Sequence, residues 1–443
     1  MPYQKGSRLP FERASKTGHI EVIQSPLVNK LFENFENPEH PPLSTDAKWQ
    51  TLPPKNRELD IIFAADGSIQ TIEEPHPPYK AIAFVKTALL KVDQVAIARV
   101  DKNNPHPFAL RDLMKKSAIF HATAFPLRHV HISDKSVYHT IREIIYESVK
   151  DAGYNNAIDG AMMETLKWIA YEKWSPNPKS QLEKFDCPYC RETVATLLFD
   201  QEEGNCPSCG GKIFITDLFG LHLSMTEDHA PGQVATDYMS VSETIMIFTP
   251  IRYFWENNRE YLKRCLMVKD GPLSLRATLA KLSAPIRRFF NYAKSIGIEV
   301  AMIGQEKSGY FFDHLQLIGR QAPNNSIFIP NNDYIRNEIQ HLSTDSVYGR
   351  DTNYGAKIFL KLSEYHKMVL NIPTGKVGEY VENPNIAYLI GFENIISTLP
   401  KILSNRYEGA LLPIELANGV ASLSTYPSAR VLEMLADSRI KTG

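Results

Sequence analysis

Hydrophobic residues recur along the chain with two different periods, which predicts a mixed α/β fold. Continuous apolar runs at 59–65, 266–269 and 298–303 predict buried strands, and 79–92 also has strand character. Between the last two apolar runs, apolar residues recur at alternating steps of four and three from Leu275 to Ile296, which predicts a long helix. A strand, a helix and a strand in this order form a βαβ unit, so we expect a parallel strand pair in an α/β core.

Further helices are predicted from capping residues and from apolar spacing. Ser25 and Pro26 suit the N-cap and first position of a helix whose apolar face runs from Leu27 to Phe35. This face is expected to pack on the core of the chain or on a partner. Helices are also predicted at 137–149, at 161–174, and at 240–257 with an interruption at Pro250.

The pattern of hydrophobic and polar residues changes over 101–235, and this change divides the chain. We interpret 1–58 as an N-terminal extension, 59–100 and 236–443 as two parts of one core, and 101–235 as an insertion. Within the insertion, 128–132 predicts a strand because hydrophobic and polar residues alternate, and 184–218 predicts a zinc ribbon. The expected architecture is thus an α/β core carrying an inserted helical and zinc-ribbon module.

The zinc ribbon rests on four cysteines, Cys187, Cys190, Cys206 and Cys209. Two Cys-x-x-Cys turns are separated by fifteen residues, a spacing that lets four thiolates surround one Zn²⁺ in a tetrahedron. We expect 193–199 and 212–215 to form the strands between and after the turns. Four protein ligands leave no open position for chemistry, so the metal is expected to be structural. Disulfides fit poorly because the N-terminus lacks a signal-peptide core and no apolar run reaches membrane length, which predicts a cytoplasmic chain.

The overall charge does not favour binding to a polyanion, since the formal net charge is −1. Between Arg259 and Lys294, however, nine basic residues face two acidic ones. The ordinary interpretation of such a run is a solvated helix face. A nucleic-acid patch is the alternative, and it gains weight because the run surrounds an acidic motif.

That acidic motif is one of two Asp-Gly pairs, each expected at the end of a buried strand. Asp66 follows IIFAA, and Asp270 follows LMVK. Asp-Gly is first of all a turn signal. At the carboxyl ends of neighbouring strands, however, two aspartates could bind Mg²⁺ or Mn²⁺, which prefer carboxylate oxygens and activate water against a phosphodiester. A third acid is expected, with Glu243 as the candidate and Glu256 and Glu260 as alternatives.

The motifs AADGS, KDGPL and GIEVAMIGQEKS, in this order, with a C-terminal Tyr-Pro before a helix, resemble the NurA nuclease family over 59–100 and 236–443. The resemblance implies an RNase H-like nuclease core and a Mn²⁺-dependent DNA nuclease. It further implies a homodimer that works with the hexameric ATPase HerA in DNA end processing or defence against foreign DNA. It assigns Asp66, Glu243 and Asp270 to the metal site.

The same resemblance assigns Tyr426 as the C-terminal tyrosine of the family and Lys307 as a basic residue able to contact a phosphate. One position departs from the pattern: Met434 stands where the family usually has His or Asp, and the next acid after it is Asp437, about one helical turn later. The departure favours an alternative in which the chain is a non-catalytic DNA-binding or assembly subunit that uses the ribbon and the basic helix.

Overall fold

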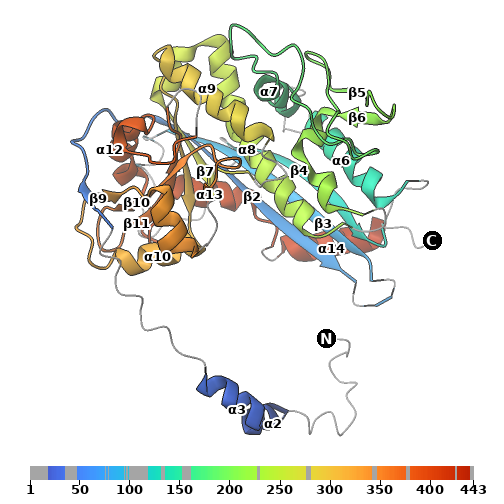
Figure 1. Ribbon diagram of the computed structural model, residues 1–443, viewed down its shortest axis with the longest axis horizontal. Coiled ribbons are helices and arrows are strands. Elements are labelled where there is room, and N and C mark those ends of the chain that lie inside the picture. Colours follow the sequence, from blue (N-terminus) through green and yellow to red (C-terminus); the bar gives the residue numbers. More distant parts are fainter. Residues whose placement is uncertain are drawn as a thin grey trace.

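The computed structural model of the chain provides the fold. It describes residues 18–34, 47–93 except 75 and 78, 95, 98, 118–130, 135–151, 161–226, 230–275, 281–341, 347–375, 380–424 and 427–439. Nine strands form one mixed sheet (Figure 1). In spatial order they are β1 (Gln50–Thr51), β9 (Ser326–Phe328), β10 (Ala356–Lys361), β11 (Lys367–Ile372), β8 (Ala301–Glu306), β7 (Cys265–Asp270), β2 (Ile61–Glu73), β3 (Ala81–Asp93) and β4 (Ala118–Arg128).

The centre of this sheet has the strand arrangement expected of an RNase H-like core. β4, β3 and β2 form an antiparallel meander, and β7 and then β8 continue the sheet parallel to β2. The crossover from β4 to β7 passes through helix α8 (Gln233–Asn257), and that from β7 to β8 through α9 (Ser283–Ser295). The predicted βαβ unit and the mixed α/β fold class are therefore confirmed.

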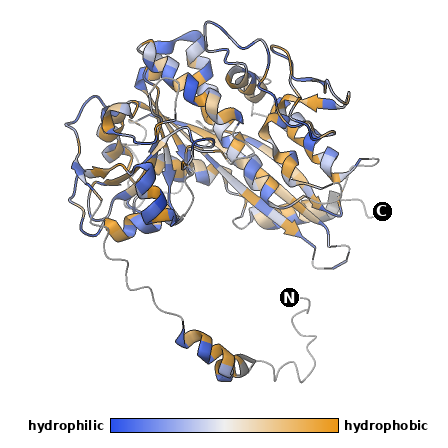
Figure 2. Ribbon diagram, in the orientation of Figure 1, coloured by the Kyte–Doolittle hydropathy of each residue, from blue (hydrophilic) through white to orange (hydrophobic). Residues whose placement is uncertain are grey.

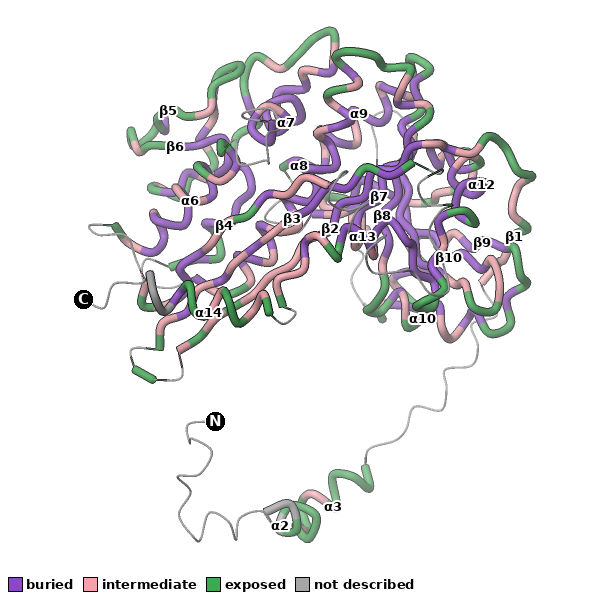
Figure 3. The backbone as a smooth tube through the Cα atoms, turned by 180° about the vertical axis from the view of Figure 1, so that it is seen from behind, coloured by how far each residue is buried: buried purple, intermediate pink, exposed green. Residues whose placement is uncertain are grey.

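Helices cover both faces of the sheet because its central strands are apolar on both sides. Odd-numbered positions of β2, such as Phe63, pack with α8, and even-numbered ones, such as Ile62, pack with α12 (Phe392–Ile402) and α13 (Leu412–Ala421). Figures 1 and 3, seen from opposite sides, show α8 on one face and α13 and α14 (Ser428–Arg439) on the other. The strands β7 and β8 are buried almost throughout (Figure 3).

Strand β2 differs from its predicted form. It was expected to end before Asp66-Gly67, but it continues to Glu73, and all thirteen of its residues pair with β3. The Asp66-Gly67 pair is therefore not a turn. Helix α8 also differs, because it runs through Pro250 without a break and packs against β2 and β3 over its length.

The stretch assigned to the insertion contains part of the sheet. Strand β4 lies within 101–235 and pairs with β3 along its whole length, and it ends at Arg128. The predicted strand at 128–132 does not form at its described residues, because β4 ends at Arg128 and His129 has a positive φ of 52°; residues 131 and 132 lie outside the described residues. The division into core and insertion stays a prediction, with the first core part extended to include β4.

After β4 come α6 (Val137–Lys150), α7 (Ala161–Ala170), β5 (Glu203–Asn205), β6 (Lys212–Phe214) and the 3₁₀ turns Ile215–Phe219 and Leu221–Ser224. α6 begins at the N-cap Ser136, whose hydroxyl accepts a hydrogen bond from the His139 amide. The segment predicted as a ribbon strand, 193–199, forms only isolated bridges and no continuous strand. Its residues bridge back to 181–185, whereas β6 pairs with β5.

The N-terminal helices α2 (Gly18–Gln24) and α3 (Pro26–Glu33) lie away from the body (Figure 1). Ser25 caps α3 as predicted, accepting from the Val28 amide at 3.4 Å. Figure 2 shows its hydrophobic and hydrophilic faces. None of its described residues is buried, and Leu27 and Phe32 are exposed, so the first alternative, packing on the core of the same chain, is not what the structure shows. The remaining elements are the 3₁₀ turns Arg259–Arg264 and Ile386–Tyr388, α10 (Tyr310–Ile318), α11 (Asn332–Tyr334) and the π-helical Ile335–Gln340.

Candidate active site and cysteine cluster

Asp66 and Asp270 lie side by side in the middle of the sheet. β2 and β7 are paired in parallel with Ala65 opposite Lys269, so the next position in register sets Asp66 beside Asp270. Paired strands are about 4.8 Å apart. Side-chain alternation puts both carboxylates on the face covered by α12 and α13, because Ala64 and Val268 belong to that core. Two acids 204 positions apart in sequence are thus neighbours.

Glu243 reaches the same place from α8, on the other face of the sheet. Gly67 makes this approach possible: a Cβ on Gly67 would lie 2.7 Å from Glu243 Oε1 and 2.4 Å from Met239 Cγ. Glu243 is 5% exposed. The two alternatives from the sequence, Glu256 and Glu260, are exposed and pair with Arg252 and Lys263. We call Asp66, Glu243 and Asp270 the carboxylate site.

Two lysines hold two of these acids. Lys269 donates from Nζ to Glu243 Oε2 at 2.8 Å and to the Asp270 carbonyl at 2.9 Å, and its side chain is 3% exposed. Lys307, in the coil after β8, places Nζ 2.8 Å from Asp270 Oδ1, and its side chain is 41% exposed. The charges of both aspartates and of Glu243 are thus partly balanced by two ammonium groups, one on a buried side chain and one on an exposed side chain.

The charged form of Asp66 is disfavoured by its surroundings. Burial, with the charges of Asp270 and Glu243 added, raises the pKa of Asp66 to about 8. Its Oδ1 accepts from the Gly67 amide at 2.8 Å, while Oδ2 is buried without a hydrogen-bond partner. Burial also raises the pKa of Glu243, and the Lys269 ammonium opposes that shift. An orphaned buried oxygen among like charges is what a bound cation would satisfy.

Two neighbours of the carboxylate site were missed by sequence reasoning. Lys269 is a charged residue inside an apolar strand, and such a residue needs a buried partner. That signal could have revealed the pair with Glu243. Gln305 of β8 lies opposite Asp270 in register, is 1% exposed and donates from Nε2 to the Gly409 carbonyl, while its Oε1 has no partner. Asp66, Asp270 and Gln305 therefore form a row across three strands.

The C-terminal candidates are only partly visible. Tyr426 lies outside the described residues. Asp437 lies in helix α14, and its side chain is outside the described part of the chain; Met434, on the same helix, is exposed. The chain ahead of Tyr426 passes the aspartate face of β2, because the Leu423 amide donates to Ser68 Oγ at 3.1 Å. Ser68 shares that face with Asp66.

The four cysteines converge at the other candidate metal site. Their sulfur atoms all lie within 4.8 Å of one another. Each turn is closed by a backbone hydrogen bond, from Arg191 N to Cys187 O at 3.0 Å and from Gly210 N to Cys206 O at 2.9 Å. Among the described residues, no set of three or more acids, histidines or cysteines besides this one is so closely grouped. This cysteine cluster could hold a metal ion, as the spacing predicted.

The basic run at 259–294 does not form one continuous patch. Its described members are distributed among separate partners: Arg264 pairs with Asp60, Arg288 with Glu172 and Glu183, and Lys269 is buried on Glu243. Arg287 donates to the carbonyls of Arg350 and Asn353. The ordinary interpretation of the run, as residues serving local structure, therefore fits most of these side chains.

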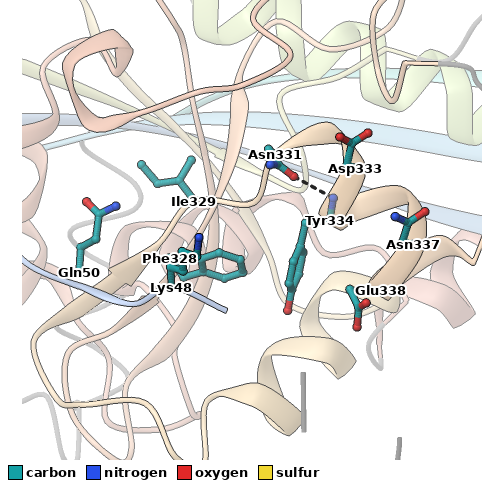
Figure 4. A pocket seen from close by; sticks show the side chains of 9 residues that line it. All are labelled: Lys48, Gln50, Phe328, Ile329, Asn331, Asp333, Tyr334, Asn337 and Glu338. Atoms are coloured by element: carbon teal, nitrogen blue, oxygen red, sulfur yellow. Dashed lines mark hydrogen bonds between the residues drawn. The ribbon is translucent and has the colours of Figure 1, made fainter. Parts of the chain in front are cut away.

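A separate hollow lies at the β1–β9 edge of the sheet (Figure 4). It has a volume of about 490 Å³ and is lined by Lys48, Phe328, Asp333 and Glu338 among others. Asn331 Oδ1 caps the next helix by accepting from the Tyr334 amide at 2.8 Å, so this side chain is already satisfied. None of the acids of the carboxylate site lines this hollow.

Comparison with known proteins gives the following. No protein-family model and no curated protein matches the sequence. Among solved structures, the NurA nuclease from Sulfolobus solfataricus matches with 9% identity over 97% of this chain and 96% of that chain, at a TM-score of 0.33. A second NurA structure matches with 11% identity over 98% and 97%, at 0.30. Both of these structures are of NurA.

A third NurA structure, with bound dAMP and manganese, matches with 12% identity over 98% of both chains, at a TM-score of 0.27. At TM-scores this low, the NurA matches carry no conclusion about chemistry, which has to come from the residues of this chain. As for membranes, none of the helices in the described ranges combines the length and the apolar character needed to cross one.

Proposed function

We propose that the protein is a metal-dependent DNA nuclease that hydrolyses phosphodiester bonds at the carboxylate site. The observation that carries the proposal is the meeting of two buried acids, from β2 and α8, with the half-buried Asp270 of β7, together with an unpartnered oxygen on Asp66. Carboxylates at one place in a sheet are the ligands that Mn²⁺ and Mg²⁺ prefer. The low net charge of the chain, −1, leaves DNA affinity to local groups and partners.

In this proposal Asp66 and Asp270 hold the divalent cation, and Glu243 holds it or orients the attacking water. The bound metal supplies an activated water and stabilises the leaving oxygen. Lys269 keeps the Glu243 carboxylate in place, since its ammonium is fixed between that group and the Asp270 carbonyl. The row of Asp66, Asp270 and Gln305 on one face gives the substrate phosphate a defined side of approach.

The remaining assignments belong to the same proposal. Tyr426 and Asp437 are proposed to complete the site from the C-terminal segment, which the Leu423–Ser68 contact brings to the face of Asp66. The cysteine cluster is proposed to bind structural Zn²⁺. A homodimer and a HerA-like hexameric ATPase are proposed partners, in the cytoplasm, with DNA end processing or defence against foreign DNA as the role.

The test is cleavage of labelled single- and double-stranded DNA with Mn²⁺ by the full chain and by Asp66→Asn and Asp270→Asn. We expect each variant to lose activity by on the order of 10³-fold or more, since several kcal/mol of charge stabilisation disappear. Cleavage that survives in both variants would rule out this site.

A second candidate, a non-catalytic DNA-binding or assembly subunit, is favoured by Met434, which is exposed on α14 where the family usually has His or Asp. It predicts no cleavage by the wild type, even with a HerA-like ATPase added, together with DNA binding that is unchanged in the aspartate variants. The same set of proteins therefore decides between the two functions.

A further inference from the structure

Lys307 occupies a position that a divalent cation would need. Its ammonium nitrogen lies 2.8 Å from Asp270 Oδ1. A Mn²⁺ or Mg²⁺ ion on the same oxygen would lie at about 2.0–2.2 Å. An ammonium group and a divalent cation on the same carboxylate oxygen would lie only about 4 Å apart and would repel each other, so the two compete for Asp270.

The two lysines of the site differ in how firmly they are held. Lys269 is buried and makes two hydrogen bonds, to Glu243 and to the Asp270 carbonyl. Lys307 is 41% exposed in its side chain and follows the last residue of β8. The Asp270 oxygen that it contacts accepts no hydrogen bond, so the contact is an ion pair without hydrogen-bond geometry. Of the two, Lys307 is the one free to move.

We propose that Lys307 is a displaceable internal counter-ion: in the metal-free protein it neutralises Asp270, and cation binding releases it towards the substrate phosphate. This inference rests on the proposed function and deepens it. The long, flexible side chain allows the ammonium to turn from the carboxylate to an anion nearby, and phosphate is a strong partner for an ammonium donor. The Lys307 ammonium, which opposes metal binding while it pairs with Asp270, thereby becomes a group that binds the substrate phosphate.

The proposal makes an unusual prediction: removing a positive charge from the site should tighten metal binding while weakening substrate binding. Lys307→Met removes the competitor from Asp270, and we expect Mn²⁺ affinity to rise about three- to tenfold, a modest factor because the pair is partly exposed. Lys307→Arg keeps the charge and should resemble the wild type.

Mn²⁺ binding is measured from the electron paramagnetic resonance signal of the free ion, at constant ionic strength and without DNA. The matched control is Lys263→Met, which changes the net charge equally but removes an exposed lysine paired with Glu260. It should leave the affinity within about twofold. Equal or weaker Mn²⁺ binding in Lys307→Met would overturn the inference.

A second measurement tests whether Lys307 contacts the nucleic-acid phosphate once a cation is bound. Binding of a labelled single-stranded oligonucleotide is measured with and without Ca²⁺, a hard cation that takes the same oxygen ligands. Lys307→Met should bind like the wild type without cation, and several-fold more weakly with it. An equal loss in both conditions would contradict the release of Lys307 by the cation.

The aspartate variants separate this inference from the function on which it rests. If Asp66→Asn and Asp270→Asn weaken Mn²⁺ binding but Lys307→Met leaves it unchanged, the metal site stands and only the counter-ion inference fails. If neither aspartate variant changes Mn²⁺ binding, the carboxylate site is not the metal site, and the proposed function fails with it.

Discussion

The cysteine cluster and the carboxylate site are two candidate metal sites prepared to very different degrees. The four sulfur atoms already lie within 4.8 Å of one another, and the three carboxylates show no comparable grouping. Turns that are local in sequence build the cluster, whereas the acids come from three separate elements on both faces of a sheet. A closed set of soft ligands suits a permanent ion. A looser set of acids held by lysines suits an ion that arrives with substrate.

The largest expected effect sharpens this contrast by removing the metal from the cluster. Cys206→Ser should release the metal and unfold the surrounding 180–214 region, because metal binding can supply about 10 kcal/mol of the folding free energy of such a module. Elemental analysis and limited proteolysis measure the two consequences. Cys265→Ser is the control, since this buried thiol lies outside the cluster and contacts the Tyr261 carbonyl.

We expect the sheet core to survive this loss. The buried pair of Arg142 and Asp217, at 2.8 Å, fastens the end of the ribbon segment to α6, and none of the nine strands of the main sheet lies in the 180–214 region. If the whole chain unfolds together with the cluster, the two sites are not independent and the comparison breaks.

The next effect concerns the carboxylate site and pH. The pKa of Asp66 is about 8 in the folded protein against 3.8 for the ordinary side chain, so the folded state binds more protons between these values. Stability therefore falls as pH rises from about 4 to about 8, and the loss is complete above that. Asp66→Asn should gain on the order of a few kcal/mol at pH 8.5 and little at pH 4.

Urea unfolding at both pH values, without divalent metal, measures this effect. Adding Mn²⁺ should stabilise the wild type at pH 8.5 more than the variant, because the ion replaces the missing counter-charge. A wild type whose stability does not change between the two pH values would mean that Asp66 is not strained.

A smaller effect is expected from Gly67→Ala. Its Cβ would lie 2.4 Å from Met239 Cγ and 2.7 Å from Glu243 Oε1, so the helix or the side chains have to shift. Overpacking of this kind costs about 1–3 kcal/mol. Gly232→Ala, at the start of α8, is the control, since its Cβ would meet nothing within 4 Å. Chemical denaturation measures both, and similar values for the two variants would show that Glu243 does not depend on the gap at Gly67.

The smallest effect tests which glutamate belongs to the site. Glu256→Gln and Glu260→Gln should change Mn²⁺ affinity by less than about twofold, because both side chains are exposed and paired with basic neighbours. Glu243→Gln should weaken it well beyond that. Isothermal titration calorimetry distinguishes them, and a strong effect of Glu256 or Glu260 would move the third ligand out of the core.

What the sequence could predict follows from how far apart the interacting residues lie. The cysteine cluster and the cap of α3 depend on residues within a few positions, and both were predicted. The βαβ unit was also predicted, because the hydrophobic periodicity of each element and the order of the elements along the chain are local features of the sequence. Asp66-Gly67 was predicted as a turn because only pairing with β3, far along the chain, keeps the strand extended there.

The same reasoning accounts for the other differences. Strand β4 contains Pro126 and lacks a clear alternation, and it was missed because its pairing with β3 stabilises it from outside. The segment 193–199 was predicted as a strand but forms only isolated bridges, because an apolar run does not show whether another segment pairs along its length. Asp66 and Asp270 were chosen from short motifs, whereas Lys269 and Gln305 depend on register, which no local pattern contains.

Strand β2 carries Asp66 in a backbone paired with β3 at all thirteen positions, and the five positions just before Asp66 also pair with β7. Amide hydrogens at its centre should therefore exchange with solvent only when the entire molecule opens. Asp270 at a strand end, Lys307 in coil and the segment after α13 lack this double support. Any rearrangement that accompanies turnover must then occur around Asp66, which serves as the stationary reference point of the site.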